Sequence, residues 1–205
     1  MTNKTNTLVT GILLILAPIL FMTAFTMLQI NFEYPDILRQ PAVTVMEKFA
    51  AGGSGLIANW YAMVFSAMLF IPISIMLHPF LAKDDSILMP LATTFGVIAG
   101  VVQMLGFVRW PFLVPTLAST YLDSSTSEAT RAAIEVTFNA FNQYAGVGIG
   151  EHLGYVFTSL WSIFIGVAMM SSPRFSKWLG WMGILSAFGI LLGTLEPAGV
   201  PLVGL

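Results

Sequence analysis

The sequence predicts an all-α polytopic membrane protein, a bundle of about five transmembrane helices. Of its 205 residues, 57% are hydrophobic and only 9% are charged, whereas soluble domains carry about 25% charged residues. The apolar residues form uncharged runs of about 20 residues, the length that a helix needs to cross a bilayer. Lipid offers no partners to unpaired backbone groups and no segment alternates like a barrel strand, so we expect these runs to be helices.

The predicted spans follow from the lengths of the uncharged runs. The first, from Leu8 to Ile30, is too long for the apolar region of a typical signal peptide, so we expect a retained helix. The fifth is short and rich in glycine. The spans are residues 8–30, 57–81, 88–109, 149–171 and 178–195. No soluble domain of usual size fits beside them, so residues 1–205 are expected to form a single integral membrane domain.

The cations of the short connections predict the orientation. With five spans these cations lie on one side of the membrane: Lys4, Lys83, Arg174 and Lys177. Short loops that carry Lys and Arg favour the cytoplasm. We therefore expect a multi-pass protein of the cell membrane with a cytoplasmic N-terminus, and two longer non-cytoplasmic connections, residues 31–56 and 110–148.

The first long connection predicts a short amphipathic helix at the membrane interface. Pro41 suits the first turn of a helix, and Gly52-Gly53 suits its end. Between them, one apolar stripe opposes Thr44, Glu47 and Lys48. The stripe consists of Ala42, Val45, Met46, Phe49 and Ala50.

The second long connection predicts another amphipathic helix, after the capping-box pattern of residues 125–128. Ile134, Phe138 and Phe141 share one face, and the other face carries Arg131, Glu135, Asn139 and Asn142. This helix either rests on the membrane with its polar face in water, or covers a cavity between the spans with Glu135, Asn139 and Asn142. Glycines at 146, 148 and 150 are expected to break or loosen the helix before the fourth span, because glycine weakens helices.

Ionisable groups at the ends of two spans predict a pocket on the non-cytoplasmic side. Arg109 closes the third span, and Glu151 and His152 open the fourth. Such groups cost roughly 3 kcal/mol in a membrane unless paired or hydrated, and so they mark candidate sites. The predicted ligand-binding residues are Arg109, Trp110, Glu135, Asn139, Asn142, Gln143, Glu151, His152 and Tyr155. Alternatively, Arg109 and Trp110 anchor the span at the interface and Glu151 only neutralises the cation.

Composition and spacing argue against several kinds of partner. A net charge of −2 with scattered cations offers no basic face for nucleic acid. The absence of cysteine removes thiolate nucleophiles and Cys-ligated metals. His78 and His152 fall near opposite ends of their spans and so cannot share a haem or a metal ion. No HExxH spacing occurs. We therefore predict neither a metal nor a cofactor.

Three strings resemble those of a known family. They are residues 32–39 (FEYPDILR), 109–115 (RWPFLVP) and 150–155 (GEHLGY). In them the chain resembles small bacterial membrane proteins grouped as a domain of unknown function, family 4386. The resemblance covers nearly the whole chain. It implies a multi-span membrane protein and supplies neither an activity nor catalytic residues.

Three functional hypotheses follow. The leading one is a pocket for a small anionic or amphipathic ligand, including lipid-derived molecules, within a protein whose constant partner is the bilayer. The second is an intramembrane lipid-modifying enzyme with Glu151 or His152 as general acid or base. The third is a structural or assembly subunit, in which residues 31–56 and 110–148 contact a membrane-protein partner or another copy of the chain.

Overall fold

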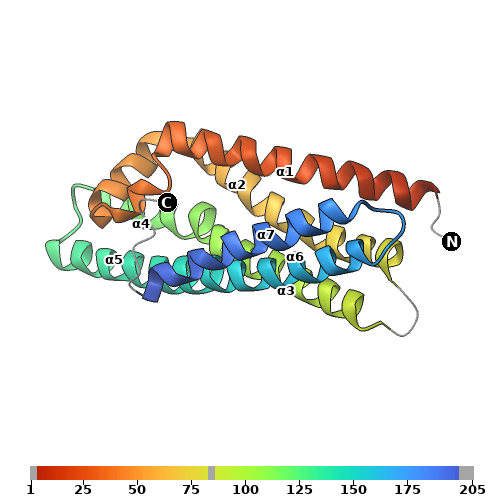
Figure 1. Ribbon diagram of the computed structural model, residues 1–205. Helices are drawn as coiled ribbons and strands as arrows, with labels where there is room; N and C mark the ends of the chain where they lie inside the picture. Colours follow the sequence, from red (N-terminus) through yellow and green to blue (C-terminus); the bar gives the residue numbers. More distant parts are fainter. Residues whose placement is uncertain (1–3, 83–85, 199–205) are drawn as a thin grey trace.

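The chain folds into a bundle of long helices in a computed structural model that describes residues 4–82 and 86–198 (Figure 1). Lys83 lies outside the described residues. In chain order the elements are α1 (Lys4–Phe32), η1 (Asp36–Arg39), α2 (Ala42–Leu81), α3 (Leu88–Phe112), α4 (Val114–Leu122), α5 (Glu128–Phe141), η2 (Asn142–Leu153), α6 (Gly154–Met170), α7 (Lys177–Leu192) and η3 (Gly193–Ala198).

The prediction of five membrane spans is confirmed. Five helices of the described residues are long and apolar enough to cross a bilayer: Lys4–Phe32, Ala42–Leu81, Leu88–Leu122, Glu128–Met170 and Lys177–Leu195. The protein is therefore an all-helical, multi-pass membrane protein. The second, third and fourth helices extend well beyond the predicted spans, because the long connections are themselves helical and continue into the spans.

The predicted helix of the first connection forms the beginning of α2. Gly53 marks the end of this segment with φ of 55° and ψ of −148°, a conformation open to glycine and strained for other residues. Most of the apolar stripe is buried within the protein, including Val45, Met46 and Phe49. Ala50 is exposed. The stripe packs on other helices of the bundle, including the ring of Trp110.

The predicted helix of the second connection continues without a break into the fourth span. Ser127 caps α5 by accepting a hydrogen bond of 3.2 Å from the backbone N–H of Thr130. Of the two expected effects of the glycines of residues 146–150, the break does not occur, whereas the α-helical winding does widen there. The chain crosses this region as the π-helix η2, so that Glu128–Met170 is one helix of 43 residues. The glycines serve packing instead, as described below.

The spans pack in a simple order, α1 on α2, α2 on α3, α3 on α6 and α6 on α7. Buried apolar side chains form two clusters, one at each end of the bundle. The Trp60 cluster, where α4 and α5 lie, includes Leu28, Phe32, Tyr34, Met46, Phe49, Trp60, Trp110 and Phe138. The Ile165 cluster, toward the other end, includes Ala17, Ile73, Leu77, Met89, Ala92 and Ile165. Between the two clusters the helices separate around a cavity.

Candidate functional site

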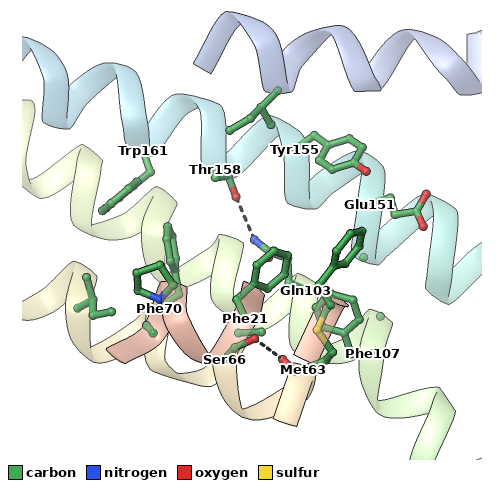
Figure 2. Close-up of a pocket in the computed structure, with 18 of the residues that line it drawn as sticks. Phe21, Met63, Ser66, Phe70, Gln103, Phe107, Glu151, Tyr155, Thr158 and Trp161 are labelled. Atoms are coloured by element: carbon green, nitrogen blue, oxygen red, sulfur yellow. Dashed lines mark hydrogen bonds between the residues drawn. The ribbon is translucent and has the colours of Figure 1, made fainter. Parts of the chain in front are cut away.

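A cavity of about 590 Å³ lies between the two clusters, and its two ends differ in chemistry. Tyr34, Arg109, Glu151 and Tyr155 line the end that faces the Trp60 cluster. The remainder of the wall is mostly apolar. Figure 2 shows Glu151 and Tyr155 at one end, and Phe70 and Trp161 at the other. This volume is within the range of small-molecule sites, about 300–1,000 Å³.

Arg109, in the last turn of α3, supplies a buried cation. Only 8% of the residue is exposed. Its guanidinium donates to the carbonyl of Gly106, one turn earlier, and to the Asn142 side-chain oxygen at 3.0 Å. Its Cζ lies 5.1 Å from the centroid of the Trp110 ring. Both hydrogen-bond acceptors are uncharged, so the guanidinium is held in place without its positive charge being neutralised by them.

Glycines let η2 approach α3 closely enough to form this site. A Cβ on Gly106 would lie 2.6 Å from the Cα of Gly150, so the two backbones touch at this crossing. A Cβ on Gly146 would lie 2.5 Å from Nη2 of Arg109. Alanine at any of these three positions would therefore separate the helices or displace the guanidinium.

The π-helical geometry of η2 selects which of its residues face the cavity. Its i→i+5 hydrogen bonds widen each turn, so residues four or five apart share a face. Asn142 and Gly146 lie against Arg109, while Glu151 and Tyr155 line the cavity beyond them. His152, the neighbour of Glu151, points elsewhere around the helix axis and is not among the lining residues.

Tyr34 brings a phenol to the polar end from the connection between α1 and α2. Its side chain is buried. Burial raises the pKa of Tyr34 well above its usual range, the charge of Glu151 raises it further, and the cation of Arg109 partly opposes both. The phenol is therefore a neutral hydrogen-bonding group at physiological pH, and it lies close enough to Glu151 and Arg109 for their charges to affect its pKa.

A packed aromatic cluster supports the polar end from behind. Trp60 and Trp110 stack with ring centroids 4.5 Å apart and an interplanar angle of 8°. Phe32 and Tyr34 meet these rings edge to face. Trp110 is fully buried and does not line the cavity. Such stacking fixes the end of α3, and with it the position from which Arg109 projects.

An uncharged hydrogen-bonded pair lies further along the cavity. Nε2 of Gln103 on α3 donates to Oγ1 of Thr158 on α6 at 3.0 Å, and both residues line the cavity. Figure 2 shows this bond between the charged end and the aromatic end. The pocket predicted from the sequence does not include Gln103, Thr158 or Tyr34. Gln103 could have been found, because it is an amide within an otherwise apolar span.

Of the nine predicted pocket residues, some line the cavity and others lie outside it. Arg109, Glu151 and Tyr155 line the cavity, and Asn142 holds Arg109. Trp110 lies behind the site. Glu135 accepts a hydrogen bond of 2.7 Å from the Tyr121 hydroxyl on α4 and so links two helices outside the cavity. Asn139 and Gln143 are exposed, and His152 is partly buried outside the lining.

The two histidines lie on different parts of the bundle. Nδ1 of His78, in the last turn of α2, lies 3.1 Å from the hydroxyl of Thr93. His152 is in η2, near the other end. Within residues 4–82 and 86–198, no three His, Asp or Glu side chains gather closely enough to hold a metal ion.

Comparison with known proteins places the chain in a family. No curated protein and no solved structure matches it significantly. A sequence model described as a domain of unknown function, DUF4386, matches residues 9–204, nearly the whole chain and all five spans except the first residues of α1. The chain therefore belongs to the DUF4386 family of domains of unknown function.

Proposed function

We propose that the protein binds a lipid-derived amphiphile in the cavity, with the anionic part of its polar head at Arg109 and its hydrocarbon chain along the apolar wall. One observation carries the proposal: a single cavity of about 590 Å³ has a buried cation at one end and apolar side chains along the rest. A free, fully polar metabolite would leave most of this wall without a favourable contact.

The apolar part of the cavity suits a hydrocarbon chain in shape and composition. Leu14 and Phe25 of α1 both line it, and they lie 11 residues apart. At 1.5 Å per residue the lined stretch of α1 is about 16 Å long. Phe21, Phe70 and Trp161 offer ring surfaces along this length. Relative to water, burying methylene groups against them contributes about 0.8 kcal/mol for each group. Relative to the bilayer, the apolar wall replaces one hydrocarbon environment by another and lets the chain follow its head group into the cavity.

Helix packing supports access from the side, through the bilayer. Among the described elements α1 packs extensively on α2 alone, whereas α7 packs on α6 and η3. Yet Phe21 of α1 and Ile190 of α7 line the same cavity. The contacts between the wall formed by α1 and the wall formed by α6 and α7 are therefore sparse, which favours entry of a lipid between them.

The polar end suits a head group that carries an anion and a hydrogen-bond donor. Arg109 donates to two protein acceptors and has five N–H groups in total, so it retains donors for a phosphate or carboxylate. Glu151 on the same lining can accept from a hydroxyl or ammonium group of the same head. The two opposite charges favour a head group with both features over a bare anion.

The same proposal places the polar end on the non-cytoplasmic side. Lys4 and Lys177 begin α1 and α7, and Arg174 donates to the carbonyl of Phe80 at the end of α2. These cations gather at the end of the bundle opposite α4 and α5 (Figure 1). Cations in short connections favour the cytoplasm. In this orientation, α5 and the start of α2 lie at the outer membrane interface.

Native mass spectrometry of detergent-purified protein, followed by lipid extraction, tests the proposal. We expect wild type to retain a defined amphiphile and Arg109→Gln to lose it. The matched control Arg174→Gln removes an exposed cation at the other end and should retain the ligand. Arg109→Lys keeps the positive charge but lacks the planar guanidinium with its paired N–H donors, so it should bind the amphiphile weakly. Thermal unfolding of each variant separates loss of ligand from loss of fold.

Two results would contradict the proposal. Wild type that remains empty after incubation with lysophosphatidate would show that the cavity does not bind such a ligand, and equal occupancy of wild type and Arg109→Gln would show that Arg109 does not hold its head group. Conversion of a lipid by wild type, abolished by Glu151→Gln, would instead identify the intramembrane enzyme of the second hypothesis.

A further inference from the structure

We infer that the Gln103–Thr158 pair recognises an acyl carbonyl, so that the ligand is an amphiphile whose anionic head joins its chain through an ester or amide. This inference rests on the proposed function, since it names the ligand class of the same cavity. It predicts that plain fatty acids and alkyl phosphates are poorer ligands than acylated heads.

The position of the pair relative to Arg109 fits a linkage group. Gln103 precedes Arg109 by six residues on α3, which places it about 9 Å deeper at 1.5 Å per residue. Gln103 also lies against Gly154, where an added Cβ would be 3.1 Å from its Cγ. A short spacer such as glycerol separates a phosphate from an acyl carbonyl by a distance of this order. Beyond the pair, the cavity is aromatic and aliphatic.

The pair retains hydrogen-bonding capacity toward the cavity. Nε2 of Gln103 donates to Thr158, which uses one donor of the amide and one acceptor of the hydroxyl. In the described part of the chain, the hydroxyl hydrogen of Thr158 and the amide oxygen of Gln103 have no hydrogen-bond partner. Polar groups in an apolar, lipid-accessible space are costly to leave unsatisfied.

Ser66 differs from Thr158 in how its hydroxyl is hydrogen-bonded. Ser66 also lines the cavity, but its hydroxyl donates to the carbonyl of Met63 in its own helix at 2.7 Å. An intrahelical bond of this kind satisfies the hydroxyl without a ligand. Thr158 instead accepts from another helix, and its own hydrogen remains available for a carbonyl oxygen. An amide N–H of a ligand would donate to the side-chain oxygen of Gln103.

Two probes that differ only in the carbonyl test the inference. They are oleoyl lysophosphatidate, an ester, and its alkyl ether analogue with the same phosphate head. Affinities are measured by tryptophan fluorescence in detergent, since Trp161 lines the cavity. We expect wild type to prefer the ester by about tenfold, the effect of one well-placed hydrogen bond.

Substitutions then assign this preference to the pair. In Thr158→Val, which removes the donor to the carbonyl, the ester-to-ether ratio should fall to about one, with affinity for the ether nearly unchanged. In Gln103→Leu, which leaves the Thr158 hydroxyl without the donor that orients it, the ratio should fall by a smaller factor. Thr158→Ser keeps the hydroxyl and should keep the preference, which distinguishes recognition from folding. Thr94→Val is the matched control, because Thr94 is an exposed residue of α3 whose hydroxyl donates to the carbonyl of Pro90 in the same helix.

Each alternative outcome has a definite meaning. Equal affinity of wild type for ester and ether, or an undiminished ester preference in both Gln103→Leu and Thr158→Val, would overturn the inference and leave the proposed function standing. Binding of neither probe would overturn both. Arg109→Gln should lower the affinity for both probes by the same factor. This result would distinguish the effect of the head-group site from that of the carbonyl site.

Discussion

The guanidinium of Arg109 donates a 3.0 Å hydrogen bond to the side-chain oxygen of Asn142, 33 residues later in the chain. This bond joins the end of α3 to the start of η2 at the polar end of the cavity. Because the cation is buried and Asn142 is an uncharged amide, the bond positions the guanidinium without neutralising its charge.

Removing the amide should destabilise the protein. In Asn142→Leu, a buried cationic donor loses its acceptor, which is expected to cost about 1–3 kcal/mol of unfolding free energy. Thermal or denaturant unfolding in detergent measures this cost. Asn31→Leu is the matched control, since Asn31 is exposed and, among the described residues, its side chain bonds Met27 of its own helix. Similar unfolding of the two variants would show that the Arg109–Asn142 bond contributes nothing to stability.

Adding a methyl group beside the guanidinium should have a comparable effect. A Cβ at residue 146 would lie 2.5 Å from Nη2 of Arg109, so Gly146→Ala must displace the side chain or part α3 from η2. We expect a loss of about 1–3 kcal/mol from such overpacking, together with weaker ligand binding. Gly148→Ala meets nothing closer than 3.5 Å and should be tolerated. Equal melting temperatures for the two variants would argue against tight packing at Gly146.

The bend in α2 should depend on Gly53. With φ of 55°, this residue occupies a conformation strained for side chains, so Gly53→Ala is expected to cost about 1–3 kcal/mol. Gly55→Ala, two residues later in open space, should instead stabilise the helix by about 0.5–1 kcal/mol. Circular dichroism during thermal unfolding compares the pair. Stabilisation by both substitutions would show that α2 has no such bend.

Tyr34 should ionise at an unusually high pH in the folded protein. Burial and Glu151 raise its pKa in the folded protein, whereas an unfolded tyrosine ionises near pH ~10. Because the raised pKa belongs to the folded state, its contribution to stability is fully present below the unfolded pKa and is lost as pH rises through the folded pKa. Stability should therefore fall with alkaline pH more steeply in wild type than in Tyr34→Phe.

The difference in phenolate absorbance between wild type and Tyr34→Phe isolates this titration from those of the other tyrosines. The phenolate of Tyr34 should appear well above pH ~10, while circular dichroism confirms that the helices persist. A midpoint near that value in folded protein would place Tyr34 in water and outside the cavity.

The orientation can be tested by cysteine labelling, because the chain contains no cysteine of its own. Ser124→Cys lies between α4 and α5, and Ser176→Cys lies between α6 and α7, at exposed positions. In intact cells, a membrane-impermeant maleimide should label the first variant and reach the second only after permeabilisation. The opposite pattern would place the N-terminus and the short cation-bearing connections outside.

The sequence was a good guide to the spans and a partial guide to the site. Runs of apolar residues indicate a membrane helix one segment at a time, so the five spans could be predicted locally. Arg109 and Glu151 could be found because charges are expensive within such runs. Tyr34 could not, since it lies in a connection that could equally have been a turn and reaches the cavity only through packing.

It was harder to predict which helix faces contact lipid and which contact other helices. The stripe containing Val45 and Phe49 reads equally well as a surface for lipid or for protein, because both are apolar. Glycines near residue 150 suggested a break, since glycine is a poor helix former in isolation. Contact between the backbones of Gly106 and Gly150 shows why they occur, and this contact depends on a helix more than 40 residues away in the chain.

The sequence by itself determined that this is a multi-pass helical membrane protein with a few charges in its spans, because hydropathy and length are properties of each segment alone. Only the tertiary structure decided that Arg109, Glu151 and Tyr34 share one cavity, that His152 lies outside its lining, and that Gln103 meets Thr158. The physical reason is that lipid accepts any apolar face. The close packing of helices, and the turn width of η2, then decide which side chains point inward.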